Sequence, residues 1–127
     1  MNKRFALFGY CAVLCFGLAA VASAQDAAKV DPAHYKVEFE NAKVRVLRFH
    51  YGPGEKSVMH SHPDAVAVFL TDGKVKFTLP DGKSVDASGK AGSTQFTPAQ
   101  VHLPENTGTT AMEGVVIELK GDWGKAK

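Results

Sequence analysis

The sequence predicts an all-β domain built as a small antiparallel barrel or sandwich. Short segments of alternating hydrophobicity recur along the chain, and turn signals rich in glycine, proline and aspartate separate them at intervals of roughly 8 to 12 residues. After residue 34, no segment of useful length has the helical period of about 3.6 residues. A chain of 127 residues with 22% charged residues has the length of one domain and the composition of a folded protein.

Residues 1–24 are predicted to be a signal peptide. Two basic residues precede an apolar run, Phe5–Val21, and the small residues at 22–24 form an A-x-A cleavage site before a polar segment. A retained membrane anchor is one alternative, because the run approaches the length of a membrane span. Lipidation at Cys15 is another, although Leu14 stands where a lipoprotein signal requires a small residue.

Removal of this segment changes the charge and cysteine content of the chain. Two of the 15 basic residues and both cysteines precede residue 25, so residues 25–127 carry 13 basic and 13 acidic residues and no cysteine. Such a chain relies on its core rather than on disulfides, and it lacks the basic clusters that bind nucleic acid. Nothing after residue 24 is long or apolar enough to cross a membrane. We expect a periplasmic or secreted protein with no nucleic-acid partner and no membrane contact after cleavage.

The predicted domain covers residues 35–120 and follows a leader (25–34) in which Pro32 would end a single helical turn. Alternation predicts a half-buried strand over 35–40, with its odd-numbered apolar side chains inward, and a longer strand over 43–51. The apolar residues of 43–51 change phase, which indicates a bulge or a strand covered on both faces.

The second half of the domain contains shorter strands. Residues 65–70 are apolar on both faces and are predicted to form a central strand, and Asp72-Gly73 is a hairpin signal. The last strand, 113–120, places its odd-numbered aliphatic side chains on one face. The other expected elements are a strand at 74–79, turns at 80–82 and 89–92, a short strand beginning at Thr94, and a tail at 121–127.

His60 and His62 are the clearest sign of chemistry in the sequence. Residues two apart in an extended segment point to the same face, so these imidazoles could supply half of a metal site. Two imidazoles this close would repel each other if both were protonated. A bound divalent cation requires neutral imidazoles and would explain why they lie close together. A chance pair on a solvated loop is the alternative. His102, which follows Pro98 and precedes Asn106, favours the metal site.

The sequence around these histidines resembles the two motifs of the cupin superfamily. The first, G-x5-H-x-H-x3,4-E-x6-G, is similar to residues 54–73, and the second, G-x5-P-x-G-x2-H-x3-N, is similar to residues 92–106. The resemblance implies a small single-domain RmlC-like cupin, a jelly-roll-like β-barrel with His60, His62 and His102 as metal ligands at its mouth.

Two departures from the motifs bear on the chemistry. The metal-ligand glutamate of the first motif falls at Val66, and the glycine of the second is Gln100, with one residue fewer before His102. Three histidines without a carboxylate would leave one divalent metal, Fe, Zn, Ni or Cu, a stronger Lewis acid with open coordination positions. Asp64 and Glu113 are candidates for a replacement acid, with solvated positions as the alternative.

Several other side chains are weaker candidates. Arg48 and His50 would line the barrel mouth or lie on the surface, and Gln95 and Gln100 could orient an imidazole or contact a substrate. The remaining polar and sulfur-containing residues near the motifs are expected to be structural: His34 in the leader, Asn106 fixing a loop, and Met59 and Met112 in packing.

The function expected from these features is metal-dependent chemistry on a small molecule. The resemblance implies dioxygenase-like chemistry, because thiol dioxygenases among the cupins bind iron with three histidines. A non-catalytic module that binds a small ligand or a metal is the main alternative, and a metal-free epimerase-like cupin is another. The resemblance also implies a homodimer, with residues 35–40 as a strand that could be exchanged between subunits.

Overall fold

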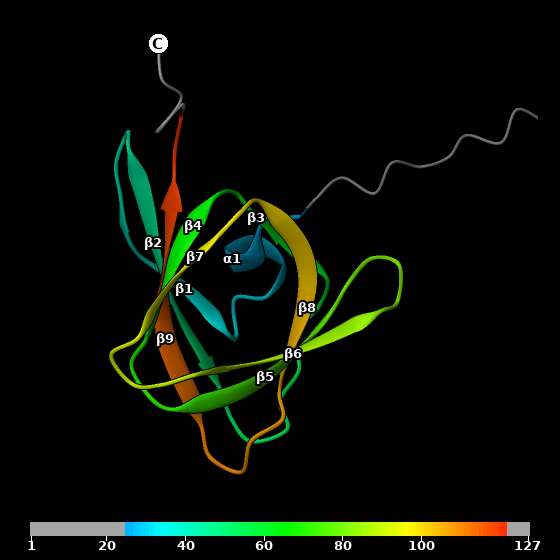
Figure 1. The fold of residues 1–127 in the computed structure, drawn as a ribbon. Coiled ribbons are helices and arrows are strands. Elements are labelled where there is room, and N and C mark those ends of the chain that lie inside the picture. The colour runs from blue at the N-terminus through cyan, green and yellow to red at the C-terminus, as the bar shows by residue number, and fades with distance from the viewer. Residues whose placement is uncertain (1–24, 122–127) are drawn as a thin grey trace, which may run out of the picture.

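Two antiparallel β-sheets packed face to face form the protein in the computed structural model, which describes residues 25–121 (Figure 1). The larger sheet has the order β1 (Tyr35–Glu40), β2 (Val44–Tyr51), β9 (Met112–Leu119), β4 (Ala65–Phe69), β7 (Thr94–Thr97). The smaller sheet has the order β3 (His60–His62), β8 (Gln100–Asn106), β5 (Gly73–Thr78), β6 (Ser84–Gly89). The predicted all-β antiparallel barrel is therefore confirmed. The predicted signal peptide lies outside the described residues.

The hydrophobic core fills the space between the two sheets. Strand β2 contributes Leu47, Phe49 and Tyr51, which are buried on one face of the strand. Phe69 from β4 and Met112 from β9 pack against them. The central position predicted for residues 65–70 is correct, because β4 lies between β9 and β7.

The prediction for strand β1 is wrong for two of its three apolar side chains. Tyr35 is buried, but Val37 and Phe39 are 48% and 52% exposed. The pairing of β1 with β2 shifts register between Val37 and Phe39, so Phe39 lies opposite Val46 rather than on the side of Leu47. A bulge of this kind turns the following side chain to the other face of the sheet. The bulge lies in β1, whereas β2 pairs with β9 without a shift.

Residues 25–34 pack on the barrel and join its two sheets. They contain one helical turn, α1 (Ala27–Val30), which contacts β1 and β3 and buries Ala27 completely. The Ser61 amide donates to the Gln25 carbonyl at 2.7 Å, and the carboxylate of Asp26 pairs with Arg45 at 2.5 Å. Among residues 25–121, no helix has the length and hydropathy that crossing a bilayer requires.

Candidate metal centre

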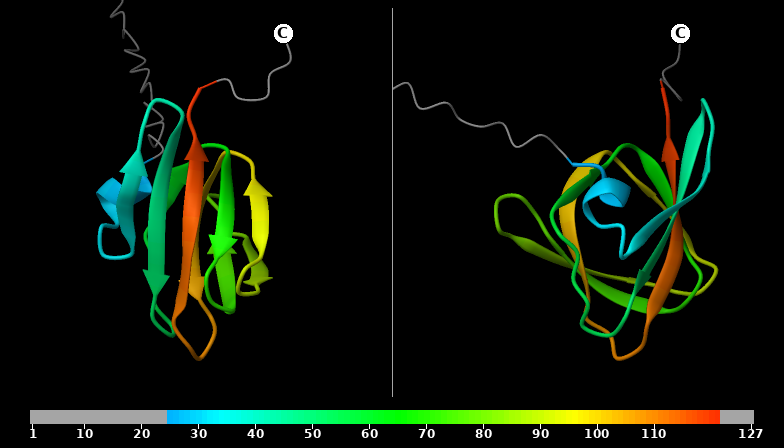
Figure 2. Two further views of the ribbon diagram at one scale, coloured as in Figure 1. Left: turned by 90° about the vertical axis from the view of Figure 1, so that its left-hand side faces the viewer. Right: turned by 180° about the vertical axis from the view of Figure 1, so that it is seen from behind.

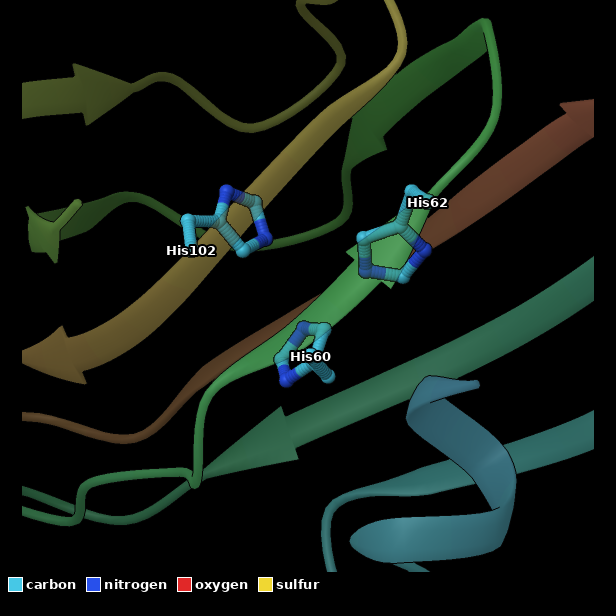
Figure 3. Close-up of side chains that lie close together, drawn as sticks. All are labelled: His60, His62 and His102. Carbon is cyan, nitrogen blue, oxygen red and sulfur yellow. The ribbon is translucent and has the colours of Figure 1, made fainter. Parts of the chain in front are cut away.

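Antiparallel pairing of β3 with β8 brings the three predicted histidines together. His60 lies directly opposite His102, and His62 lies one pleat further along the same face of β3. Their ring centroids are 4.9 to 5.4 Å apart, and one nitrogen from each ring can be chosen so that all three lie within 4.8 Å of one another (Figure 3). All three side chains are buried. The spacing of His60 and His62 and the motif resemblance at His102 predicted these three residues, and they form a compact cluster that could hold a metal ion.

Hydrogen bonds at Nδ1 fix the orientation of the His60 and His62 rings, and so the direction in which Nε2 of each ring points. His60 Nδ1 lies 2.8 Å from the Val58 carbonyl, and His62 Nδ1 lies 2.7 Å from Glu118 Oε1. A carbonyl or a carboxylate oxygen accepts, so each Nδ1 carries the proton and donates. In a neutral ring with this proton on Nδ1, Nε2 is the nitrogen whose lone pair can bind a metal.

The site contains polar atoms that the protein itself does not satisfy. Nε2 of His60 and both ring nitrogens of His102 are buried and have no hydrogen-bond partner among the described residues. A buried polar atom without a partner costs about 1 to 3 kcal/mol, so a cluster of them in one place requires a reason. A cation coordinated by Nε2 of His60 and by the unprotonated nitrogen of His102 would satisfy two of these three atoms. Neutral imidazole nitrogens suit a transition metal.

Burial and the nearby imidazoles keep His60 and His102 uncharged. Burial, followed by the proximity of His62, lowers the pKa of His60 to about 4. Burial, followed by the proximity of His60 and His62, lowers the pKa of His102 to about 3. The His102 ring also stacks on Phe77, at a centroid distance of 4.7 Å. Both rings are therefore neutral and able to coordinate at neutral pH.

Glu118 is the site residue that sequence patterns did not identify. It lies on β9 and is 2% exposed, and Arg45 donates to its Oε2 at 2.6 Å while His62 donates to its Oε1. Burial alone would raise the pKa of Glu118, but the hydrogen bonds from His62 and Arg45 outweigh it and lower the pKa. The available signal was parity: in an alternating strand, Glu118 takes the face opposite to Ile117.

The two acids considered as replacement ligands lie elsewhere. Asp64 is exposed and accepts from the Ala99 amide, and Glu113 pairs with Arg48 on the outer face of the sheet. Val66 pairs with Ile117, also on the outer face, whereas the next residue, Ala67, lines the cavity beside the histidines. The wall of the site at this strand is therefore an alanine methyl group rather than a carboxylate.

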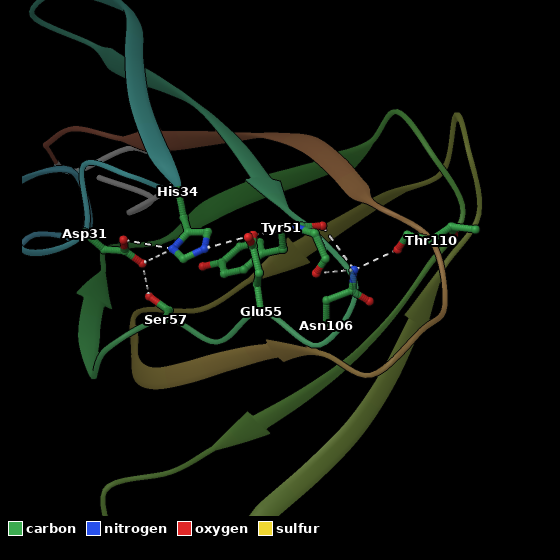
Figure 4. Close-up of polar contacts among 8 residues, drawn as sticks. Asp31, His34, Tyr51, Glu55, Ser57, Asn106 and Thr110 are labelled. Atoms are coloured by element: carbon green, nitrogen blue, oxygen red, sulfur yellow. Dashed lines mark hydrogen bonds and ion pairs between the residues drawn. The ribbon is translucent and has the colours of Figure 1, made fainter.

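A second polar network runs through Glu55, His34, Asp31 and Ser57 (Figure 4). Exposed Glu55 lies 3.2 Å from Nε2 of His34, whose Nδ1 lies 2.8 Å from Asp31. Ser57 donates to Asp31 at 2.5 Å, and the Ser57 hydroxyl lies 3.2 Å from Nδ1 of His60. His34, expected to be structural, thus takes part in a continuous chain that orients His60.

The remaining candidates divide between the cavity, the core and the surface. Gln100 lines the cavity and Met112 is packed in the core. Arg48 pairs with acids on the outer face, and His50 and Gln95 are exposed, so the surface alternative holds for Arg48 and His50. Asn106 fixes a loop as expected, because its amide donates to three backbone carbonyls, those of Tyr51, Gly52 and Thr110.

A cavity of about 70 Å³ adjoins His62 and His102. Its walls are largely apolar, with aromatic rings from both sheets, and Thr97 and Gln100 add polar atoms. Tyr51 also lines it, and the Tyr51 hydroxyl is buried without a hydrogen-bond partner among the residues that the structure describes. A space of this size holds a few water molecules or a small organic group. The site therefore combines a possible metal position with room for a small ligand.

Comparison with known proteins identifies the family. A family model described as "Cupin domain" matches residues 47–118. The structure of a cupin domain from Bordetella pertussis Tohama I is 29% identical, with a TM-score of 0.64, covering 68% of this chain and 92% of that one. A Klebsiella pneumoniae protein with a double-stranded β-helix domain is 25% identical, with a TM-score of 0.55, covering 71% of this chain and 78% of that one.

A more distant structure supports the fold alone. An RmlC-like cupin from Methanocaldococcus jannaschii is 17% identical, with a TM-score of 0.55, covering 68% of this chain and 78% of that one. A search of curated proteins found no match.

We expect the metal-free protein to lose stability as the pH falls below about 6.5, the ordinary pKa of imidazole. Below this pH the histidines of the unfolded chain bind protons. In the folded protein His60 and His102 stay unprotonated until the pH approaches their pKa values of about 4 and about 3. Each histidine therefore contributes about 1.4 kcal/mol per pH unit to the fall. Urea unfolding in the presence of a chelator, at pH values between about 7 and 5, measures this fall in the free energy of unfolding.

The variant His102→Leu should reduce the slope of the free energy of unfolding against pH by close to one proton. The control His50→Ala, which removes an exposed imidazole, should leave that slope unchanged. Equal slopes in His102→Leu and the unsubstituted protein would contradict the lowered pKa of His102.

Proposed function

The chain belongs to the cupin family, and on this basis we propose that it binds one divalent transition metal ion through His60, His62 and His102. The observation that carries the proposal is the convergence of three buried imidazoles, two of which have ring nitrogens without a hydrogen-bond partner among residues 25–121. Imidazole suits iron, zinc, nickel and copper alike, so the donor set does not choose among them. When bound, the ion would supply Lewis-acid or redox chemistry next to the cavity.

We further propose that the protein is an enzyme with dioxygenase-like chemistry on a small molecule. The cavity beside His62 and His102 is small and mostly apolar, which would exclude bulk water and admit only a compact substrate. The Tyr51 hydroxyl and Gln100 are the groups placed to hydrogen-bond that substrate. Glu118 would hold His62 in the tautomer that coordinates, as carboxylates behind metal-bound histidines do.

One observation favours a second candidate, a binding module without catalysis. The two buried carboxylates near the site, Asp31 and Glu118, are already engaged with His34 and Ser57 and with His62 and Arg45. Among the described residues, the cavity wall therefore offers no free carboxylate as a general acid or base. Capture of a small ligand or of the metal itself requires no such group.

The processed chain, residues 25–127, is expected to contain close to one metal ion per chain, measured by elemental analysis after purification and after loading with each of the four metals. His60→Ala and His102→Ala should lose it, because each removes one of only three donors. His50→Ala, which removes an exposed imidazole, should retain it. The absence of stoichiometric metal in the unsubstituted protein under all conditions would contradict metal binding.

Oxygen uptake by the iron-loaded protein then separates the two candidates. The enzyme proposal expects uptake with at least one compound of a panel of small thiols and diols, and no uptake by the His102→Ala variant. A protein that binds metal but consumes no oxygen across the panel would be assigned to the binding module instead.

Glu118→Gln is expected to weaken metal affinity by about 10- to 100-fold, because the amide keeps the shape of the side chain but loses the charge that strengthens His62 as a ligand. Competition with a chromophoric chelator measures the effect. Asp26→Asn is the matched control, because it removes the other carboxylate on Arg45 without contact with His62. Equal affinity in Glu118→Gln and the unsubstituted protein would show that the carboxylate does not tune the site.

We also propose export to the periplasm or the medium, with removal of residues 1–24. The features that support it are the apolar run and the A-x-A site. A cut before Gln25 would keep the carbonyl that accepts from Ser61 and the carboxylate that pairs with Arg45. Mass spectrometry of protein from the periplasm or medium should give a chain that begins at Gln25; a full-length chain retained in the membrane fraction would sink this proposal.

A further inference from the structure

We propose that the cavity beside the histidines selects a small ligand with one anionic, metal-binding headgroup and a short, uncharged tail made mostly of hydrocarbon. The inference rests on the proposed metal site, and it adds the class of molecule that the site would take. Two observations carry it: the order of polar and apolar side chains along the cavity, and the lack of ionic side chains among the described residues of its wall.

One end of the cavity is polar. Gln100 on β8 lies opposite His62 on β3. Thr97 on β7 and Glu118 on β9 both lie opposite Ala65 on β4. Thr97 is therefore level with the carboxylate that holds His62. Thr97 and Gln100 both line the cavity and are half-buried, so its polar atoms gather at an end that solvent reaches.

The wall becomes apolar along the inner face of the larger sheet, which the left view of Figure 2 shows from outside. Two residues beyond the polar end, Ala67 on β4 pairs with Val116 on β9. Two residues further, Phe69 pairs with Gly114, which pairs with Phe49 on β2. Residues two apart in a strand share a face, so these levels follow one another along the cavity. Ala67 and Val116 face inward and are still half-buried, as expected of side chains that border open space.

The far end of the cavity is closed. Tyr51, Val75 and Met112 line it and are 1%, 2% and 3% exposed. Met112 packs against the backbone of Gly73, where a Cβ would lie 2.6 Å from its sulfur. Burial raises the pKa of Tyr51, so its hydroxyl stays neutral and can donate a hydrogen bond but cannot pair with an ion. The closed end therefore limits the length of a tail and accepts only an uncharged one.

The cavity offers no partner for a second charge on the ligand. None of the described residues that line it is a lysine, an arginine, an aspartate or a glutamate. The charged groups behind the wall are already engaged: Glu118 accepts from His62 and Arg45, and Arg45 also pairs with Asp26. Burial of a charge without a partner is strongly unfavourable. A ligand with an ammonium or a carboxylate on its tail should therefore bind poorly.

A single negative charge is favoured at the other end of the ligand. Three neutral imidazoles would leave a divalent ion with its positive charge, and one anionic donor such as a thiolate would offset part of it. The amide of Gln100, opposite His62, can donate a hydrogen bond to that headgroup. The cavity volume of about 70 Å³ then leaves room for only a few carbon atoms.

Thiol binding to the cobalt-loaded processed chain tests this selection. The absorption spectrum of the bound Co²⁺ reports thiolate coordination, and three thiols of similar size are compared without oxygen: 1-propanethiol, 2-aminoethanethiol and mercaptoacetate. At equal thiolate concentration, we expect 1-propanethiol to bind more tightly than either charged thiol by about tenfold or more, because only its tail can enter the apolar part of the cavity.

Variants of the inner face locate the tail. Ala67→Leu should weaken binding of 1-propanethiol by about tenfold or more, because the larger side chain fills the cavity. Val116→Ala should shift the preferred alkanethiol to a longer one. Val68→Leu and Val115→Ala are the matched controls, because they change neighbouring residues on the outer face, and they should leave the preference unchanged. Circular dichroism and bound cobalt establish that each variant is folded, and Val116→Ala serves if Ala67→Leu is not.

Two outcomes would overturn this proposal and leave the metal site standing. One is a cobalt-loaded protein that binds the three thiols equally or prefers a charged one. The other is a length preference that folded Ala67→Leu and Val116→Ala both leave unchanged, since the tail would then lie outside this cavity. A protein that retains no cobalt would overturn the metal site together with this proposal, and elemental analysis identifies that case before any thiol is added.

Discussion

The hydrogen bond between Glu118 and His62 is the interaction on which the site depends, because it joins the two sheets at the point where the histidines meet. Glu118 belongs to the central strand of the larger sheet and His62 to the short edge strand of the smaller one. Arg45 and Asp26 extend the link to the segment before the barrel. A buried carboxylate between an imidazole and a guanidinium is stable only while both partners stay in place. The geometry of the metal centre and the closure of the barrel are therefore coupled.

The histidine cluster lowers the stability of the metal-free fold. Three imidazoles are packed against Tyr35 and Phe77. Nε2 of His60 and both ring nitrogens of His102 have no hydrogen-bond partner within residues 25–121. The networks behind them, Glu118 at His62 and Ser57 with Asp31 at His60, hold the rings in place despite this cost. Orientation by a surrounding shell is what a coordination site requires, because the ligand positions must exist before the ion arrives.

Sequence patterns predicted the strands and the three histidines but only part of their surroundings. Alternation and turn signals act over a few residues, which is why the all-β fold and the paired histidines were predictable. The contact between His62 and Glu118 joins residues 56 apart, and no local pattern encodes it. The bulge in β1 reversed the side of Phe39 for a similar reason: the register depends on the partner strand. Parity alone would have placed Glu118 inside once Ile117 was known to face outward.

Strand β9 is the element whose position decides the geometry of the candidate site. Glu118 faces the interior and holds His62, while its neighbour Ile117 faces outward. Side chains of neighbouring residues in a strand leave on opposite faces, so the twist and register of β9 decide which of the two side chains reaches the histidines. Because β9 lies between β2 and β4, its displacement would also disturb Arg45 on β2, the second partner of Glu118. The orientation of His62 therefore depends on the pairing of β9 with both neighbouring strands.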